Sequence, residues 1–227
     1  QGAGISPLLA NVFLHYVLDL WAHQWRRRHA RGRIVIVRYA DDFVMGFETE
    51  ADAREMLSAL TQRLAGFGLA LHEDKTRLIE FGRLPALARR KRGKRRPETF
   101  SFLGFTHYCG WTRDGRFILK RKTQATRLAR KLATLRQEMK WRMHKPLDEQ
   151  HQWLCQVLRG HYGYYGVSHN YPALSAFHQA VRRIWYHALR HRSQKARCLT
   201  WDRFKALVLR YSLPLPKITW PWAGRSA

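Results

Sequence analysis

Two adjacent aspartates, Asp41 and Asp42, lie between two apolar runs of the sequence. The runs RIVIVRY and FVMGF are rich in β-branched and aromatic residues, which predicts a hairpin with the aspartates at its tip. Adjacent carboxylates repel each other unless a cation binds there. Mg²⁺ prefers hard oxygen ligands, usually one or two carboxylates together with substrate phosphates. The pair therefore indicates a divalent-metal site, and in nucleotidyl transfer two such metals stabilise the attacking and leaving oxygens.

An ordinary turn is the alternative interpretation of the same four letters, YADD. Aspartate is common in turns because its side chain caps backbone amides. The tetrapeptide alone leaves both interpretations open, so the rest of the chain has to decide between them.

Positive charge is the strongest property of the composition. The 227 residues contain 42 Lys and Arg against 16 Asp and Glu, a formal net charge of +26. A charge this large opposes a compact fold unless a polyanion neutralises it, so nucleic acid is the first candidate partner. An anionic membrane surface is the second candidate, and a simply basic soluble protein is the third. The three cysteines are widely spaced and form no CxxC pair, which indicates neither a disulfide framework nor a zinc ribbon and fits the cytoplasm.

The first part of the chain alternates helical and strand patterns. Ser6 and Pro7 predict the N-cap and the first turn of a helix. The hairpin follows, and a capping-box pattern at Thr49 predicts a second helix. A further strand is expected at residues 77–81. This order predicts an α+β domain over residues 1–85.

The second part is expected to begin with a basic loop at residues 86–97, which marks the boundary between the two halves. Residues 98–119 predict two strands joined by a turn at Asp114-Gly115. Residues 120–213 have helical periodicity with interleaved basic residues, which predicts an all-helical basic bundle. A Pro-rich tail, residues 214–227, ends the fold.

Four segments resemble the motifs of reverse transcriptases, in the order of that family. QGAGISPLLANVFL is similar to motif B, YADD with its flanking strands to motif C, GLALHEDKT to motif D, and FSFLGF to motif E. The resemblance implies an RNA-directed DNA polymerase with a partial right-hand palm followed by a helical thumb. It also implies two Mg²⁺ ions, dNTPs, an RNA template and a DNA primer.

The resemblance assigns roles to individual residues. Asp41 is implied as the principal metal ligand, Asp42 as its neighbour near the metals, and Lys75 as a cation at the triphosphate. The nucleotide pocket is implied to include Gln1, Gly2, Ser6, Pro7 and Tyr39. The primer grip is implied at Phe102, Leu103 and Gly104. Candidate phosphate contacts on the thumb are Arg121, Lys122, Arg127, Arg130 and Lys131. An ordinary surface lysine at Lys75 and a plain core strand at motif E are the alternatives.

Within the reverse transcriptases, the chain resembles the group II intron type. HYVLDLW, RLIEFGR, FLGFTHYCG and the helical region MHKPLDEQHQWLCQVLRGHYGYYGVSHN carry this resemblance. It implies that the thumb is a maturase (X) domain, that the protein binds its intron RNA and assists splicing, and that it acts in the bacterial cytoplasm. Tyr162, Tyr164 and Tyr165 fit either base stacking or interhelical contacts.

The chain departs from the family's pattern in one respect that bears on catalysis. The family's palm carries a third carboxylate in motif A, on a strand before motif B, and no aspartate here has a comparable context. Asp19 is expected on the outer part of the motif B helix. We therefore expect the 227 residues alone to give little or no primer extension, and we expect an N-terminal fragment or a dimer partner to complete the site.

Two other functions stay open at this point. One is a non-catalytic RNA-binding splicing factor, and the other is a retron or diversity-generating reverse transcriptase. The intact YADD favours an enzyme, because a pure binder has no need of exposed paired carboxylates. The long helical half favours the group II intron type.

Overall fold

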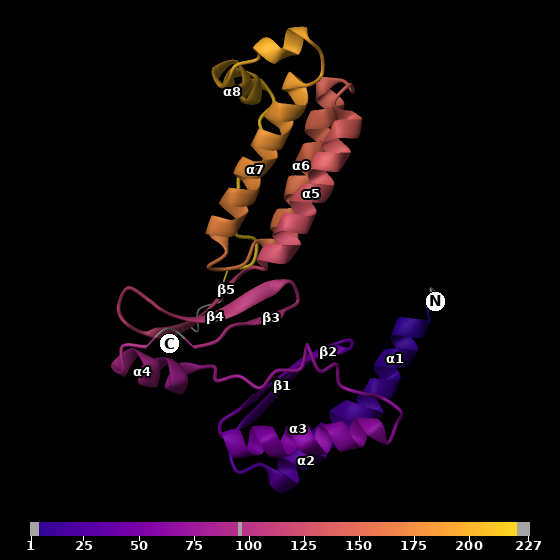
Figure 1. Ribbon diagram of the computed structural model, residues 1–227, viewed down its shortest axis with the longest axis vertical. Coiled ribbons are helices and arrows are strands. Elements are labelled where there is room, and N and C mark those ends of the chain that lie inside the picture. Colours follow the sequence, from indigo (N-terminus) through magenta and orange to yellow (C-terminus); the bar gives the residue numbers. More distant parts are fainter. Residues whose placement is uncertain (1–4, 95–96, 222–227) are drawn as a thin grey trace. The chain divides into compact units, whose positions relative to one another are not determined.

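The computed structural model describes residues 5–94 and 97–221 and divides into two compact units, residues 1–80 and 81–227 (Figure 1). Helices and two small antiparallel sheets make up the units, in agreement with the expected α+β class. Within the described residues, no helix combines the length and apolarity needed to cross a bilayer.

Unit 1 places a β-hairpin against helices. Its elements are α1 (Ser6–Leu14), a π-helical segment η1 (His15–Leu20), α2 (Trp21–His29), β1 (Ile34–Tyr39), β2 (Asp42–Phe47) and α3 (Glu50–Ala65). Pro7 lies in the first turn of α1, as predicted. The predicted cap at Ser6 is wrong, because Ile5 holds the N-cap position and no side chain caps the helix.

The start of α3 is tied to the loop before β1. The Thr49 hydroxyl accepts the backbone N–H of Asp52 (3.2 Å), which confirms the predicted cap. The Asp52 carboxylate accepts the backbone N–H groups of Gly32 (3.0 Å) and Arg31 (3.1 Å). Burial raises the pKa of Asp52, but these hydrogen bonds outweigh it and hold the pKa below its usual value. Asp52 thus fixes the base of the hairpin.

One face of the hairpin supplies the core of unit 1. Ile34 packs with Trp25 and Met56 of the flanking helices, and these side chains are at most 7% exposed. Side chains alternate between the two faces of a strand, so Val35 and Val37 point away from this core and are about half exposed. The hairpin is therefore anchored on one face and open on the other.

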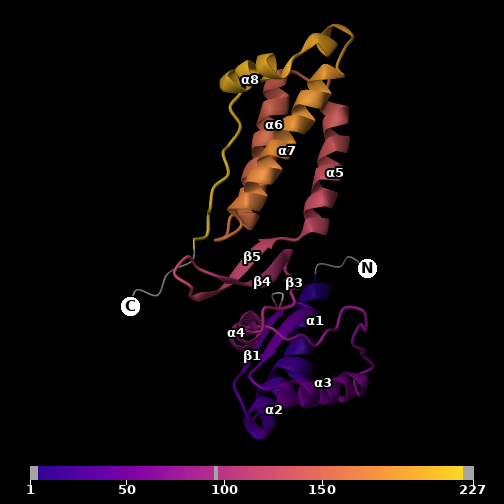
Figure 2. The ribbon, with the colours of Figure 1, turned by 60° about the vertical axis from the view of Figure 1, so that its left-hand side comes forward.

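Unit 2 contains a three-stranded sheet and a helical bundle. Its elements are α4 (Arg83–Lys91), β3 (Phe100–Phe102), β4 (Phe105–Trp111), β5 (Phe117–Thr123), α5 (Ala125–Arg142), α6 (Leu147–Tyr165), α7 (Tyr171–Arg190), a 3₁₀ turn η2 (Lys195–Cys198) and α8 (Trp201–Arg210). Helices α5, α6 and α7 lie side by side, with the sheet at one end of the bundle and α8 at the other (Figures 1 and 2). Trp185, Phe177, Leu154, Leu158 and Leu174 are completely buried in this bundle.

Three expectations about the middle of the chain were wrong. The segment 77–81 has no regular secondary structure and belongs to neither sheet. The segment expected as a basic loop from residue 86 continues helix α4 to Lys91, because Ala86 is buried and Arg90 stacks 4.7 Å from the Trp111 ring centre. The two units divide after Glu80 rather than within that loop.

FSFLGF, expected as one strand, is instead a tight hairpin. Phe102 pairs with Phe105 across a two-residue turn. Leu103 (φ +49°) and Gly104 (φ +78°) both have positive φ angles, as the turns favoured in two-residue hairpins require. The predicted turn at Asp114-Gly115 is confirmed between β4 and β5.

The sheet and the bundle of unit 2 are joined by a buried asparagine. The side-chain amide of Asn170 donates to the Thr123 hydroxyl and to the Tyr165 carbonyl, both at 2.8 Å. Its side-chain oxygen accepts the backbone N–H of Thr123, also at 2.8 Å. Asn170 is 0% exposed. The polar atoms of its side chain are therefore buried where β5, α6 and α7 meet, and all of them are hydrogen-bonded.

The tail runs back from α8 along the bundle (Figure 2). The backbone N–H groups of Thr219 and Trp220 donate to the carbonyl of Gly166 (2.7 and 2.8 Å), and the Tyr162 hydroxyl donates to the Pro214 carbonyl (3.2 Å). Part of the predicted Pro-rich tail, residues 222–227, lies outside the described residues. The described part packs against the end of α6.

Candidate active site

The hairpin tip carries the two aspartates. Tyr39 pairs with Asp42, so Ala40 and Asp41 alone form the two-residue turn. Ala40 has a φ of +54°, a left-handed conformation that residues other than glycine adopt uncommonly. Neighbouring contacts must therefore hold this turn in place.

The carboxylates of Asp41 and Asp42 are exposed and free. Neither forms a hydrogen bond or an ion pair with any residue that the structure describes. Across residues 5–94 and 97–221, no group of three or more His, Cys, Asp or Glu side chains is arranged to hold a metal. Two unpaired carboxylates suit a hard cation such as Mg²⁺, which takes one or two of them and completes its shell with waters and phosphate oxygens.

Arg38 is the residue that holds the tip. Its Nε and Nη2 atoms donate to the two carboxylate oxygens of Asp19 (2.8 and 2.7 Å). Its Nη1 atom donates to the carbonyl of Ala40 (2.8 Å) and to the side-chain oxygen of Asn11 (2.9 Å). The Arg38 side chain is only 15% exposed. One guanidinium thus connects the helical segment to the backbone of the hairpin turn.

The pairing with Arg38 changes the ionisation of Asp19. The hydrogen bonds from Arg38 hold the pKa of Asp19 below its usual value, although partial burial opposes them. Asp19 was expected on the outer part of its helix. That expectation is wrong, since the carboxylate faces β1.

Sequence reasoning missed the contacts of Arg38, although a signal was present. Ile34, Ile36 and Arg38 alternate on the inward side of β1, and a charged residue at an inward position needs a buried partner. Asn11 and Asp19 are eight residues apart, a spacing that places two residues near one face of a helix. The pattern points to the contact but does not identify the partners.

The residues expected at the nucleotide pocket are only partly described. Gln1 and Gly2 lie outside the described residues. Ser6 and Pro7 are exposed at the start of α1, and Tyr39 is 65% exposed beside the tip. The side-chain amide of Asn11 donates to the Pro7 carbonyl (3.0 Å), so Asn11 connects the start of α1 to Arg38.

Lys75 lies in a turn between α3 and α4. Its side chain is exposed, and its backbone N–H donates to the His72 carbonyl (3.1 Å). No hydrogen bond or ion pair joins it to Asp41 or Asp42.

The residues expected as the primer grip belong to unit 2. Phe102 ends β3, and Leu103 and Gly104 form the turn. The Tyr164 hydroxyl donates to the Leu103 carbonyl (2.9 Å), and a Cβ atom on Gly104 would lie 3.1 Å from the Tyr165 hydroxyl. Helix α6 therefore supports this turn directly.

The expected phosphate contacts lie at the end of β5 and along the first turns of α5. Arg127, Arg130 and Lys131 have i, i+3 and i+4 spacing, which places them on one side of α5. Lys122 is also exposed, whereas Arg121 is half buried. We call the four exposed residues, Lys122, Arg127, Arg130 and Lys131, the basic strip.

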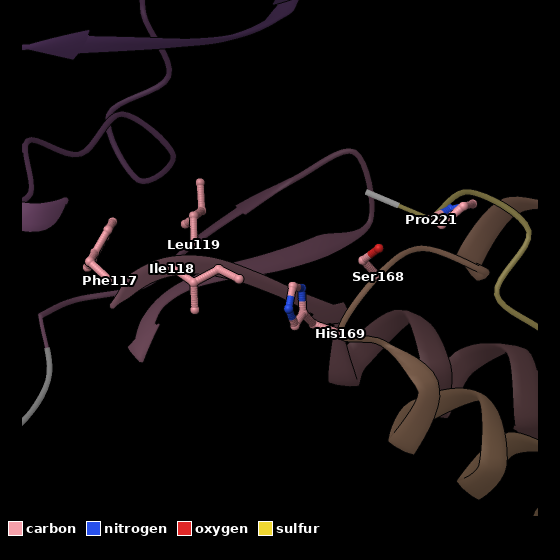
Figure 3. A pocket seen from close by; sticks show the side chains of 6 residues that line it. All are labelled: Phe117, Ile118, Leu119, Ser168, His169 and Pro221. Carbon is pink, nitrogen blue, oxygen red and sulfur yellow. The ribbon is translucent and has the colours of Figure 1, made fainter. Parts of the chain in front are cut away.

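A separate open pocket of about 630 Å³ lies in unit 2 (Figure 3). It is lined by Phe117, Ile118, Leu119, Ser168, His169 and Pro221. Burial and the charges of Lys120 and Arg121 lower the pKa of His169. The lining is mostly apolar and contains no carboxylate, so we assign no catalytic role to this pocket.

Comparison with known families matches residues 1–107 to the reverse transcriptase (RNA-dependent DNA polymerase) family. The matched segment includes the hairpin tip with Asp41 and Asp42. It also includes the β3–β4 turn and supports the resemblance to reverse transcriptases over those residues. No curated protein was found to match the chain.

Proposed function

We propose that the chain is part of a group II intron reverse transcriptase, an RNA-directed DNA polymerase that also binds its intron RNA and assists splicing. The observation that carries the proposal is the hairpin tip. Two exposed, unpaired carboxylates stand on a turn held by Arg38, within the segment that matches the reverse transcriptase family.

Asp41 and Asp42 are the proposed ligands of Mg²⁺. When bound there, Mg²⁺ supplies charge stabilisation to the triphosphate and to the primer 3′-hydroxyl. The rigid strands on both sides of the turn keep the two carboxylates in place, which such chemistry requires. Lys75 is proposed as a cation for the triphosphate. The start of α1 and the exposed ring of Tyr39 are proposed to contact the incoming nucleotide.

A third carboxylate is proposed to come from outside the described residues, either from another part of the same polypeptide or from a partner. The open side of the hairpin is suitable for a strand that carries this third carboxylate. Val35 and Val37 form an exposed apolar face there. The hairpin sheet has only two strands, so each strand has one edge without a ladder partner among the described residues.

The nucleic acid is proposed to bind unit 2 as well. The β3–β4 turn would contact the primer end, and the basic strip would contact phosphates. A chain with a formal net charge of +26 gains sequence-independent affinity for RNA in this way. The maturase role and the cytoplasmic location rest on the resemblance of the helical half to group II intron proteins.

Substitution of Asp41 separates an enzyme from a pure RNA binder. In the natural polypeptide that contains these residues, Asp41→Ala is expected to abolish cDNA synthesis on the intron RNA and to leave RNA affinity unchanged. Asp114→Ala is the matched control, because Asp114 is an exposed aspartate at another hairpin turn. If Asp41→Ala retains cDNA synthesis, the proposed function is wrong.

A further inference from the structure

Arg38 carries a positive charge three and four residues before two carboxylates that need a metal. The Arg38 guanidinium lies beside the turn, since its Nη1 atom binds the Ala40 carbonyl (2.8 Å), and without another partner it would be available to pair with a carboxylate of the tip, because arginine binds carboxylates strongly and in a bidentate manner. Such a pair would occupy the oxygen atoms that the metal requires. The tip therefore works as a metal site only if Arg38 is directed elsewhere.

The contacts of Arg38 meet this condition. Three donor nitrogens make four hydrogen bonds, to Asp19, Asn11 and the Ala40 carbonyl. A guanidinium has five N–H groups, so nearly all of its donor capacity is used. The Asp19 carboxylate accepts the hydrogen bonds from Nε and Nη2 and also supplies the compensating negative charge.

Arg38 also supports the backbone of the hairpin turn, which explains why an arginine stands so close to the metal ligands. Its bond to the Ala40 carbonyl fixes a turn whose first residue has a φ of +54°. An arginine at this position can thus support the backbone of the tip, but it also brings a cation close to the metal ligands. The pairing with Asp19 keeps the support of the turn and compensates the positive charge near the metal ligands.

We propose that Asp19 is a positioning residue, a counter-ion that holds the Arg38 guanidinium away from Asp41 and Asp42 and so reserves them for divalent metal. This inference rests on the proposed function only in taking the tip to be a metal site. It assigns Asp19 a role through Arg38 and no direct contact with the metal.

Direct metal binding tests the proposal on the 227-residue chain. Mn²⁺ is titrated while NMR records paramagnetic broadening of the backbone amides at the hairpin tip. Asp19→Asn is expected to raise the Mn²⁺ concentration for half-maximal broadening by about threefold or more, because an uncompensated cation beside the site opposes metal binding. Asp19→Glu keeps the charge and is expected to stay within about twofold of the parent chain.

The double variant Asp19→Asn with Arg38→Gln distinguishes the counter-ion role from other roles. It removes both charges, so Mn²⁺ binding is expected to return to within about twofold of the parent chain. If the double variant binds as weakly as Asp19→Asn, then Asp19 is a metal ligand or a purely structural residue, and the proposal is overturned. An unchanged Mn²⁺ requirement in Asp19→Asn overturns it as well.

One control and one fallback comparison complete the design. Glu55→Gln removes a carboxylate of α3 that accepts a hydrogen bond from Arg31 (3.1 Å), and it is expected to leave Mn²⁺ binding unchanged. If Asp19→Asn fails to fold, the double variant is compared with the parent chain alone. Folding with normal Mn²⁺ binding then supports the proposal, and weaker binding overturns it.

Failure of this inference is distinguishable from failure of the proposed function. If Asp41→Ala abolishes cDNA synthesis while Asp19→Asn binds Mn²⁺ normally, only the counter-ion role is wrong. If Asp41→Ala retains synthesis, the proposed function is wrong whatever the Mn²⁺ titrations give.

Discussion

The Tyr164 hydroxyl donates a 2.9 Å hydrogen bond to the backbone carbonyl of Leu103. The bond joins α6 to the turn between β3 and β4, across 61 residues of sequence. Leu103 has a φ of +49°, which costs a residue with a side chain some stability. Tyr164 thus stabilises the conformation of a turn that is proposed to contact the primer.

Tyr164→Phe is expected to weaken primer binding. One hydrogen bond contributes about 0.5–1.5 kcal/mol, so the KM for primer–template should rise roughly 2–10-fold. The maximal rate should change little, since the hydroxyl supports the turn that is proposed to contact the primer and has no proposed role at Asp41 or Asp42. Steady-state primer extension measures both parameters.

Tyr171→Phe is the control for this variant. Tyr171 is also about half exposed, and its hydroxyl has no hydrogen-bond partner in the described part of the chain. Equal effects of the two substitutions would contradict the role given to Tyr164.

Gly166→Ala is expected to displace the tail from the bundle. A Cβ atom at Gly166 would clash with the Tyr162 carbonyl and the Thr219 hydroxyl and would lie 2.8 Å from the Lys217 carbonyl. Overpacking of this kind typically costs about 1–3 kcal/mol in the free energy of unfolding. Urea unfolding followed by tryptophan fluorescence measures the loss.

Gly160→Ala, within α6, is expected to give the opposite result. A Cβ atom there meets no atom within 4 Å, and alanine favours a helix over glycine by about 0.5–1 kcal/mol. This variant should therefore be more stable than the parent. A Gly166→Ala variant of unchanged stability would show that the tail contact has no energetic importance.

His161 makes the stability of unit 2 dependent on pH. Its ring stacks on Phe177 with centroids 3.8 Å apart, it is 7% exposed, and its Nε2 atom is buried without a partner among the described residues. Burial, together with the charge of Lys131, lowers the pKa of His161 to about 4. The ordinary value is about 6.5.

The sign of the effect follows from these two values. As pH falls below about 6.5, the unfolded chain takes up a proton that the folded chain accepts only near pH 4, so the folded state loses stability across this window. The expected loss is on the order of 1–3 kcal/mol. Urea unfolding at several pH values measures it.

His161→Phe should flatten this dependence. Some of the slope should remain, because burial also lowers the pKa of His178. A parent protein with equal stability at about pH 4.5 and about pH 7, two values that span most of this window, would contradict the role given to His161.

Neutralising the basic strip should weaken RNA binding in a salt-dependent way. Each lost phosphate contact is expected to reduce the slope of log K against log salt concentration by about 0.7–0.9. Filter binding or fluorescence anisotropy at several salt concentrations measures the slope for substitutions to glutamine. The substituted residues are Lys122, Arg127, Arg130 and Lys131.

Arg116→Gln and Lys145→Gln are the control substitutions. Both residues have an acidic partner, with nitrogen–oxygen distances of 2.9 Å to Asp114 and 3.7 Å to Glu149, so they should contribute less to the slope. A salt slope that does not change when the basic strip is neutralised would contradict its role in RNA binding.

Local chemistry predicted much of the fold. The cap predicted at Thr49 is confirmed, because its hydroxyl accepts the backbone N–H of Asp52 (3.2 Å). The positive φ of Gly115 confirms the second hairpin turn. Each of these features depends on residues a few positions apart, which is why the sequence is sufficient to find them.

The contacts that hold the hairpin tip and the β3–β4 turn are of another kind. Arg38 reaches Asp19 and Asn11 across 19 and 27 residues, and Tyr164 reaches Leu103 across 61. Local pattern fixes which face of an element is inward, but not which element it meets. The same limit explains FSFLGF, whose apolar letters fit one strand, whereas the positive φ angles of Leu103 and Gly104 make it a hairpin.

Templated DNA synthesis tests the central claim most directly. The natural polypeptide that contains these residues is incubated with poly(rA), oligo(dT) and labelled dTTP, with Mg²⁺ or with EDTA. We predict Mg²⁺-dependent incorporation that falls at least about a hundredfold in Asp41→Asn and in Asp42→Asn, as the loss of transition-state charge stabilisation requires. Incorporation that persists in both variants, or in EDTA, would contradict a polymerase site at the hairpin tip.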